Sequence, residues 1–182
     1  MDKSDVELIE SFLDGGEGAF NEIVERHKKR IYYAAYRMVK NHEDAMDLSQ
    51  EVFIRAYKSI RHFNKSSSLY TWLYRITINL SINHIKRESH YEKVDMDKVT
   101  LESTDRWSNP RGSFESAQLN GNINQAVDRL PIRQRTVFMM RIFDDLRYED
   151  ISRVMGISVG AAKANYFHAV NKLREYLKDV VK

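Results

Sequence analysis

The sequence predicts an all-α protein built from two small helical domains joined by a flexible linker. Apolar residues recur at helical spacing in both parts of the 182-residue chain. The chain has only seven Gly and two Pro, fewer than the tight turns of an all-β fold need. It has no Cys, which excludes disulfides, thiolate catalysis and cysteine-based zinc sites. Its ten Tyr, eight Phe and two Trp are too many apolar anchors for a fully disordered chain.

Two helices are predicted at the N-terminus. The first spans residues 4–14, and Ser4 is placed to cap it. Its apolar side holds Val6, Ile9 and Leu13. Residues 15–18, three of them Gly, separate it from a longer helix over 19–40. We expect Asn41 to adopt the left-handed conformation that ends the longer helix.

Two further helices follow, over 43–62 and 69–87, separated by a polar turn at 64–68. Beside the apolar side of the first of them lie three carboxylates: Asp44, Asp47 and Glu51. They could complement the helix dipole or form a docking surface for a protein. No His stands at ligand spacing and no second set of carboxylates is predicted to face them. The sequence therefore indicates no metal site, no cofactor and no enzyme.

The rest of the chain is predicted to be a linker and a second domain, which gives boundaries of 1–88, 89–117 and 118–182. Residues 1–87 carry 14 basic and 12 acidic side chains, a net charge of +2. Residues 88–119 carry 4 and 7, a net of −3, and residues 120–182 carry 11 and 7, a net of +4. This asymmetry is consistent with polyanion contact by both ends, although ordinary surface charge would also produce it.

Residues 148–177 predict a helix-turn-helix, preceded by a helix over 131–143. The first helix ends at Gly156, which can turn the chain, and Ser158 caps a second helix that is free to enter a major groove. The exposed side of that second helix offers phosphate or base contacts through Lys163, Asn165, His168 and Lys172. A helical hairpin with a solvated basic side is the alternative.

The segment 63–87 interleaves aromatic with basic and amide side chains. The aromatic members are Phe63, Tyr70, Trp72 and Tyr74. The polar members are Lys65, Arg75, Asn79, Asn83, Lys86 and Arg87. Such a mixture suits single-stranded nucleic acid, since bases stack on rings while phosphates meet cations. Alternatively, Trp72 and Ile76 simply belong to the core.

No stretch of the sequence reaches the apolar length that a membrane span needs, and the N-terminus lacks the pattern of a signal peptide. We therefore expect a cytoplasmic protein without membrane insertion. The residues alone indicate a helical, two-domain nucleic-acid-binding protein.

Three stretches together resemble bacterial sigma-70 factors of the extracytoplasmic-function (ECF) type. Residues 44–57 (DAMDLSQEVFIRAY) are similar to region 2.2 of that family, and residues 70–80 (YTWLYRITINL) to regions 2.3 and 2.4. Residues 148–160, from YEDI to GISVG, are similar to region 4.2. The likeness covers nearly the whole chain except the linker.

The resemblance implies an alternative sigma factor, which is not an enzyme. Such a protein binds core RNA polymerase, recognises the −10 and −35 promoter elements and promotes DNA melting. It implies that the β′ clamp helices dock on Asp47, Leu48, Gln50, Glu51 and Phe53. The β flap would dock near Val137 and Phe138, and an anti-sigma factor is a further implied partner.

The resemblance also assigns promoter-reading residues to both domains. For the −10 element these are Phe63, Asn64, Lys65, Ser66, Ser67, Trp72, Arg75, Ile76, Asn79, Asn83, Lys86 and Arg87, with a flipped base held by the loop at 63–68. For the −35 element they are Tyr148, Ser158, Lys163, Ala164, Asn165, Phe167, His168 and Lys172.

The recognition helix departs from the family pattern. The family commonly has Arg at the positions of His168 and Val170, and Arg–guanine pairs are the commonest specific contact in the major groove. We therefore predict a shifted −35 preference, with Asn165 or His168 contributing. The modest net charge predicts weak DNA binding by the protein without polymerase.

Two other functions remain open. A stand-alone helix-turn-helix regulator of duplex DNA would explain residues 148–177, but it leaves the region 2.2 likeness and the aromatic segment unexplained. A helical adaptor that binds only proteins would show no salt-dependent DNA affinity.

Overall fold

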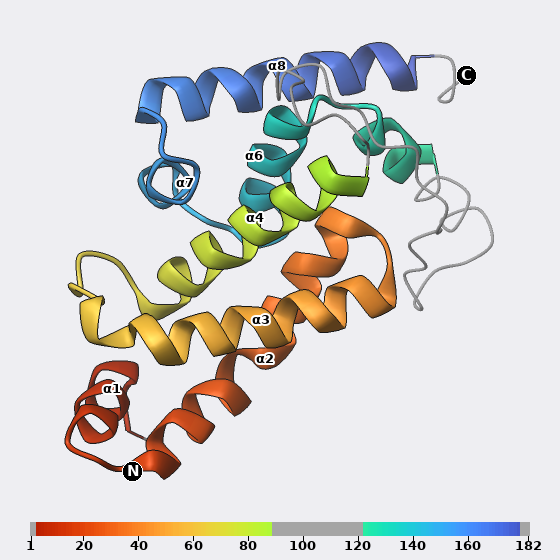
Figure 1. Cartoon of the computed structure of the whole chain (residues 1–182). Helices are drawn as coiled ribbons and strands as arrows, with labels where there is room; N and C mark the ends of the chain where they lie inside the picture. The colour runs from red at the N-terminus through yellow and green to blue at the C-terminus, as the bar shows by residue number, and fades with distance from the viewer. Residues whose placement is uncertain (1–2, 89–121, 179–182) are drawn as a thin grey trace. The chain divides into compact units, whose positions relative to one another are not determined.

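The computed structural model describes residues 3–88 and 122–178, and the chain divides into two compact units, Met1–His90 and Tyr91–Lys182 (Figure 1). Every regular element in these described ranges is a helix, which confirms the predicted all-α fold in two domains. The predicted linker, 89–117, lies outside the described residues. No helix within the described ranges is long and apolar enough to cross a membrane.

The first helix, α1 (Asp5–Leu13), begins at Ser4 as predicted. The Ser4 hydroxyl accepts a hydrogen bond from the Glu7 N–H (3.3 Å), and the Glu7 carboxylate accepts one from the Ser4 N–H (2.6 Å). The prediction of the apolar side is confirmed for Ile9 but wrong for Val6 and Leu13, which are 40% and 44% exposed. The helix instead buries Leu8 beside Ile9, because α1 lies against α2 along a single side that includes both of them.

Helix α2 (Glu17–Val39) ends one residue earlier than predicted. Lys40, and not Asn41, adopts the left-handed conformation, with φ of 60°. The Asn41 side chain accepts a hydrogen bond from the Asp44 N–H (3.1 Å) and so caps α3 (His42–Ser59). Asn is among the best N-caps, so its role in starting the next helix prevails over ending the previous one.

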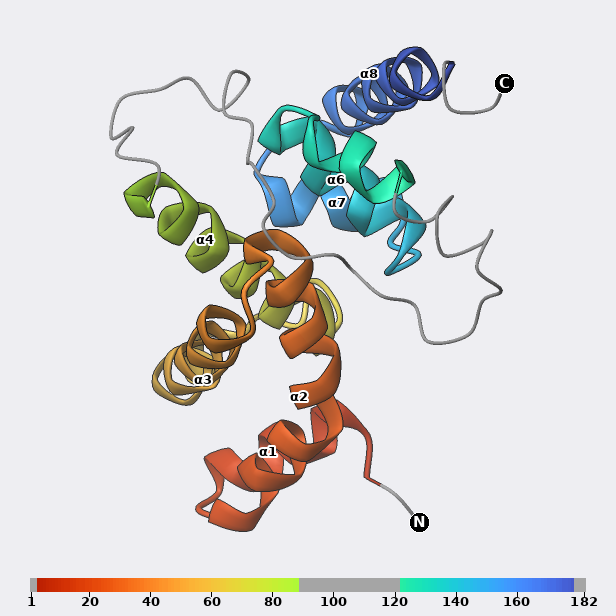
Figure 2. The same cartoon turned by 90° about the vertical axis from the view of Figure 1, so that its right-hand side faces the viewer.

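The core of the first unit lies between α2, α3 and α4 (Leu69–Glu88), as Figure 2 shows. A short 3-10 helix, η1 (Ile60–His62), follows α3 and leads into the loop before α4. Small side chains at the helix contacts let the backbones approach closely. The fully buried alanines are Ala34, Ala35, Ala45 and Ala56.

The side chain of Asp5 in α1 contacts two residues of α2. One carboxylate oxygen accepts from Arg26 at 2.8 Å, and the other lies 3.1 Å from Nε2 of His27. The His27 ring is buried and stacks on Tyr70 of α4. Burial lowers the pKa of His27, although the charge of Asp5 and its hydrogen bond oppose that effect.

The second unit contains a helix over 122–128 followed by α6 (Ile132–Ile142), α7 (Tyr148–Met155) and α8 (Val159–Leu177). Gly156 has φ of 64° and ends α7, and the Ser158 hydroxyl accepts from the Ala161 N–H (3.1 Å) to start α8. The predicted helix-turn-helix is therefore confirmed. Gly156 ends its first helix and Ser158 caps its second, as expected.

A buried ion pair joins the helix over 122–128 to α6. Arg135 is 1% exposed, and its guanidinium lies 3.8 Å from the carboxylate of Asp128. Burial lowers the pKa of Arg135 to about 10, and the Asp128 charge opposes that shift. Removing either residue would take a close opposite charge away from a buried charge, which is among the costlier single changes in a small domain.

The buried His27 predicts acid sensitivity of the first unit. Its folded pKa lies below the unfolded value of 6.5, so the unfolded chain takes up the proton first. The stability that neutral His27 contributes is therefore fully present above pH 6.5 and is lost as the pH falls toward the folded pKa. Urea unfolding at about pH 7.5 and pH 5.5 should show a larger loss for the wild type than for His27→Gln. Equal losses in the two proteins would contradict the assignment.

The turn of the helix-turn-helix predicts unequal effects of two glycine substitutions. Gly156→Ala should destabilise α7 and α8 by about 1 kcal/mol, since the site is open but its φ is left-handed. Gly160→Ala lies in the first turn of α8 with free space around it and should cost nothing. Amide hydrogen exchange in the two helices measures both effects. Similar protection in both variants would contradict this account of the turn.

Candidate nucleic-acid and protein interfaces

The loop at 63–68 leaves η1 and enters α4 through two local hydrogen bonds. The Asn64 side chain accepts from the Ser66 N–H (3.1 Å), and the Ser68 hydroxyl accepts from the Thr71 N–H (3.0 Å). Lys65 between them has φ of 57°, which is uncommon for a residue other than glycine. Asn64, Lys65 and Ser66 are exposed and Ser67 is partly exposed, so the loop offers its polar groups to solvent.

The aromatic residues near this loop separate into two sets. Phe63 is largely buried and packs against the partly exposed Trp72, with ring centroids 5.5 Å apart. Tyr70 and Tyr74 are only 6% and 1% exposed. The prediction that these two tyrosines present their rings to nucleic acid is therefore wrong, and Trp72 is the ring of α4 that remains accessible.

One side of α4 gathers the other predicted −10 residues. Arg75, Asn79, Asn83 and Arg87 are exposed, while Ile76 and Lys86 are partly exposed. Their spacing from Trp72 to Arg87, in steps of three and four, places them on one side of the helix. We call this set the α4 strip: Trp72, Arg75, Ile76, Asn79, Asn83, Lys86 and Arg87. It combines one ring, amides and cations, the groups that single-stranded DNA requires.

The loop also contacts α1, which sequence analysis missed. The Lys65 ammonium lies 2.6 Å from the Glu10 carboxylate, although 55 residues separate the two. Residues 3–18 carry five carboxylates and one lysine. A phosphate that reaches Lys65 must therefore replace an existing partner and approach an acidic helix.

The predicted polymerase-docking residues of α3 do not share one side. Leu48 and Phe53 are 7% and 9% exposed and belong to the core. Asp47 and Gln50 are exposed, and Glu51 is partly exposed and binds Arg55 at 2.6 Å. Of the three carboxylates noted in the sequence, Asp44 lies 3.3 Å from His84 and so joins α3 to α4. The described residues contain no cluster that could hold a metal ion.

Sequence analysis missed the apolar part of the same surface. Met46, Ile54 and Tyr57 are 43%, 48% and 51% exposed. With Gln50 they follow helical spacing along the outer side of α3, and Asp47 and Glu51 flank them. We call Met46, Gln50, Ile54 and Tyr57 the α3 stripe. Exposed apolar side chains rimmed by charge are typical of a protein-docking surface.

The recognition helix α8 presents its predicted residues unequally. Ala164, Phe167 and His168 are exposed on the side opposite the buried Ala162 and Ala169. Lys163 and Lys172 lie toward the two edges of that side, and the Lys163 ammonium is 5.8 Å from the ring of Tyr148. Ser158 is exposed at the start of the helix, while Tyr148 and Asn165 are only partly exposed.

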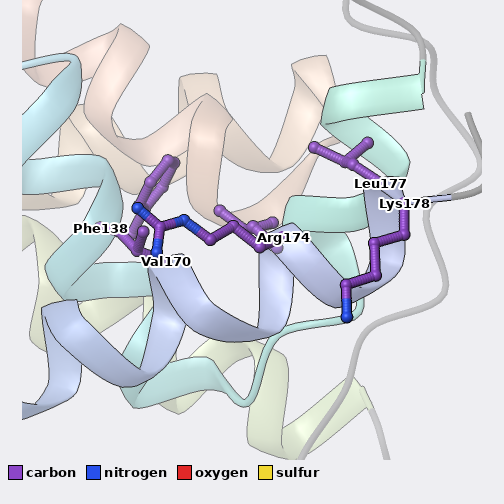
Figure 3. A pocket seen from close by; sticks show the side chains of 6 residues that line it. Phe138, Val170, Arg174, Leu177 and Lys178 are labelled. Carbon is purple, nitrogen blue, oxygen red and sulfur yellow. The ribbon is translucent and has the colours of Figure 1, made fainter. Parts of the chain in front are cut away.

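A hollow of about 470 Å³ lies between α6 and the C-terminal half of α8 (Figure 3). Its lining is Phe138, Val170, Leu173, Arg174, Leu177 and Lys178. Apolar side chains dominate it, and the Arg174 side chain lies along it between Phe138 and Leu177. Val137, predicted to share a docking role with Phe138, is fully buried.

Comparison with known proteins assigns the chain to a family. The profile of Sigma-70 region 2 matches residues 23–91, and that of Sigma-70 region 4 matches residues 120–173. The ECF RNA polymerase sigma factor SigW of Bacillus subtilis is 32% identical over 94% of this chain and 96% of its own. The RNA polymerase sigma-H factor of Pseudomonas aeruginosa is 30% identical over 99% and 97%.

A solved structure supports the same fold. The sigma factor RpoE of Bartonella quintana, crystallised with the anti-sigma factor NepR, superposes with a TM-score of 0.68 at 24% identity, over 87% of this chain and 96% of its own. Helix α1 precedes the residues that the region 2 profile matches. Both profiles, in order, and two relatives matched over nearly their full lengths show that the chain belongs to the sigma-70 family of transcription initiation factors and is an ECF sigma factor.

Proposed function

We propose that this protein binds core RNA polymerase, directs it to promoters with a −10 and a −35 element, and helps to melt the −10 region. The observation that carries the proposal is the presence of two helical units with different exposed surfaces. One unit has a polar loop beside the α4 strip, and the other has a helix-turn-helix with an accessible second helix. The protein acts by binding and not by catalysing a reaction.

In this proposal the α3 stripe docks on the β′ clamp helices. Asp47 and Gln50 contribute polar contacts beside the stripe. Glu51 can do so as well, but the polymerase must then compete with Arg55 for its carboxylate. Met46, Ile54 and Tyr57 supply the apolar anchors, since Leu48 and Phe53 are buried in the core. Anchors of this kind dominate the binding energy of protein interfaces.

The loop at 63–68 and the α4 strip bind the −10 element. Unstacking a base costs a few kcal/mol, and contacts with a ring and with amide donors can offset this cost. Trp72 supplies the ring, and Asn64, Asn79 and Asn83 supply amides. Lys65, Arg75, Lys86 and Arg87 meet phosphates, and Ser66, Ser67 and Ile76 complete the surface around the extruded base.

The second unit binds the −35 element as duplex DNA through α8. Ser158 lies at the start of that helix, where backbone N–H groups and the helix dipole attract phosphate. Tyr148, Lys163 and Lys172 flank the groups that face the bases. The hollow lined by Phe138 and Leu177 is the docking place for the β flap.

An anti-sigma factor is the further partner that we propose. The structurally similar RpoE of Bartonella quintana was crystallised with such a protein, NepR. An inhibitor that covers the α3 stripe would compete directly with the polymerase, because the exposed apolar side chains of that stripe can serve only one partner at a time.

The docking proposal predicts a selective loss of polymerase affinity. Ile54→Asp places a charge in the α3 stripe and should weaken binding to core polymerase by about tenfold or more. Val6→Asp is the matched control, since Val6 is similarly exposed in the same unit but lies on α1. Surface plasmon resonance with immobilised core enzyme gives both Kd values. An equal effect of the two substitutions would reject the stripe as the docking surface.

The overall proposal predicts a new promoter specificity when the protein joins the polymerase. We expect transcripts with discrete 5′ ends from a genomic fragment library when the protein is added to bacterial core enzyme, and shared elements upstream of those ends. The protein alone should bind the same fragments weakly and with a steep dependence on salt. Tight, sequence-specific binding without core enzyme, and no transcripts with it, would favour a stand-alone regulator.

A further inference from the structure

The recognition helix carries an unusually exposed aromatic ring. Phe167 is 62% exposed, more than any other large apolar side chain in the described ranges. It contributes nothing to the core of the second unit, whose α8 members are Ala162, Ala169 and Leu173. A ring so placed on the reading side of a recognition helix is available to the DNA.

Two of the polar side chains near Phe167, those of Asn165 and Lys163, lie against other groups of the protein, whereas His168 is exposed beside the ring. The Asn165 amide donates to the carbonyl oxygen of Ala161 at 2.9 Å, which ties it to its own helix, and its side chain is only partly exposed. The Lys163 ammonium lies toward the ring of Tyr148, at an edge of the reading side. The ring of Phe167 is thus more accessible than the Asn165 side chain.

Small residues allow the start of α8 to approach the floor of the groove. Gly160 and Ala164 precede Phe167 on the same side of the helix, at spacings of seven and three residues. A Cβ added at Gly160 would meet nothing closer than 3.9 Å, so that side is open. Helix-turn-helix proteins contact base edges with the N-terminal part of the second helix. Phe167 lies about one turn after Ala164 on this same exposed side.

We propose that Phe167, supported by Ala164, recognises the 5-methyl group of a thymine in the −35 element. The inference rests on the proposed function and adds the class of base that is read. A phenyl ring cannot form the hydrogen bonds that distinguish most base edges, and the thymine methyl is the one apolar group that the major groove displays.

Deoxyuridine tests this directly, because it keeps the pairing of thymine and lacks only the methyl group. The probe is a promoter duplex obtained from the transcription experiment, with each −35 thymine replaced singly by deoxyuridine. Holoenzyme assembled from core enzyme and the full chain should bind one such duplex about fourfold more weakly than the parent. Deoxyuridine placed in the spacer should have no effect.

Two variants connect the methyl effect to the ring. Phe167→Ala should weaken binding to the parent duplex by about tenfold and abolish the response to deoxyuridine. Phe167→Leu keeps an apolar side chain and should retain part of that response. The exposure of Phe167 means that neither change disturbs the core, and circular dichroism checks this.

A second substitution separates the methyl group from the identity of the base pair. At the sensitive position, 5-methylcytosine paired with guanine should bind better than unmethylated cytosine in wild-type holoenzyme, and the two should bind alike in Phe167→Ala.

Two outcomes would overturn the inference. One is a wild-type holoenzyme that binds every deoxyuridine duplex as tightly as the parent, while a scrambled −35 element still abolishes binding. The other is an equal deoxyuridine effect in wild type and Phe167→Ala. Either result leaves the proposed function standing, whereas a holoenzyme indifferent to scrambling of both promoter elements would refute the proposed function itself.

Discussion

Close packing of α2, α3 and α4 determines what the first unit can present to its partners. Alanines at positions 35, 45 and 56 let the three helices meet, and the larger apolar residues fill the space around them. Each helix buries one side only, so its opposite side is left for binding. The α3 stripe and the α4 strip therefore lie on separate helices of one rigid core, where one can face a protein while the other faces DNA.

In the second unit, the short turn between α7 and α8 determines what the unit can present to its partners. The left-handed Gly156 and the Ser158 cap set the direction in which α8 leaves α7. The buried Arg135–Asp128 pair joins α6 to the preceding helix beneath them. A buried ion pair contributes little net stability but penalises alternative packings in which either charge loses its partner. The recognition helix is thus presented by a small but well-specified core.

Electrostatic contacts of α1 link the loop at 63–68 to the rest of the first unit. Asp5 binds Arg26 and His27 near one end of the helix, and Glu10 binds Lys65 of the loop nearer the other end. The Glu10–Lys65 pair is exposed, so it is weak and easily exchanged for a phosphate. An acidic helix beside the loop is consistent with a protein that has little affinity for DNA until polymerase holds both together.

The sequence by itself determined the helices, the helix-turn-helix, the family and most of the caps, because these depend on local periodicity and on residues such as Ser4, Gly156 and Ser158. Only the tertiary structure decided which side of each helix is buried. Leu48, Phe53 and Tyr74 read as candidates for binding but lie in the core, whereas Ile54 and Tyr57 are exposed. Helical spacing defines a stripe, but its burial depends on neighbouring helices. The Glu10–Lys65 contact, across 55 residues, likewise arises only from the fold.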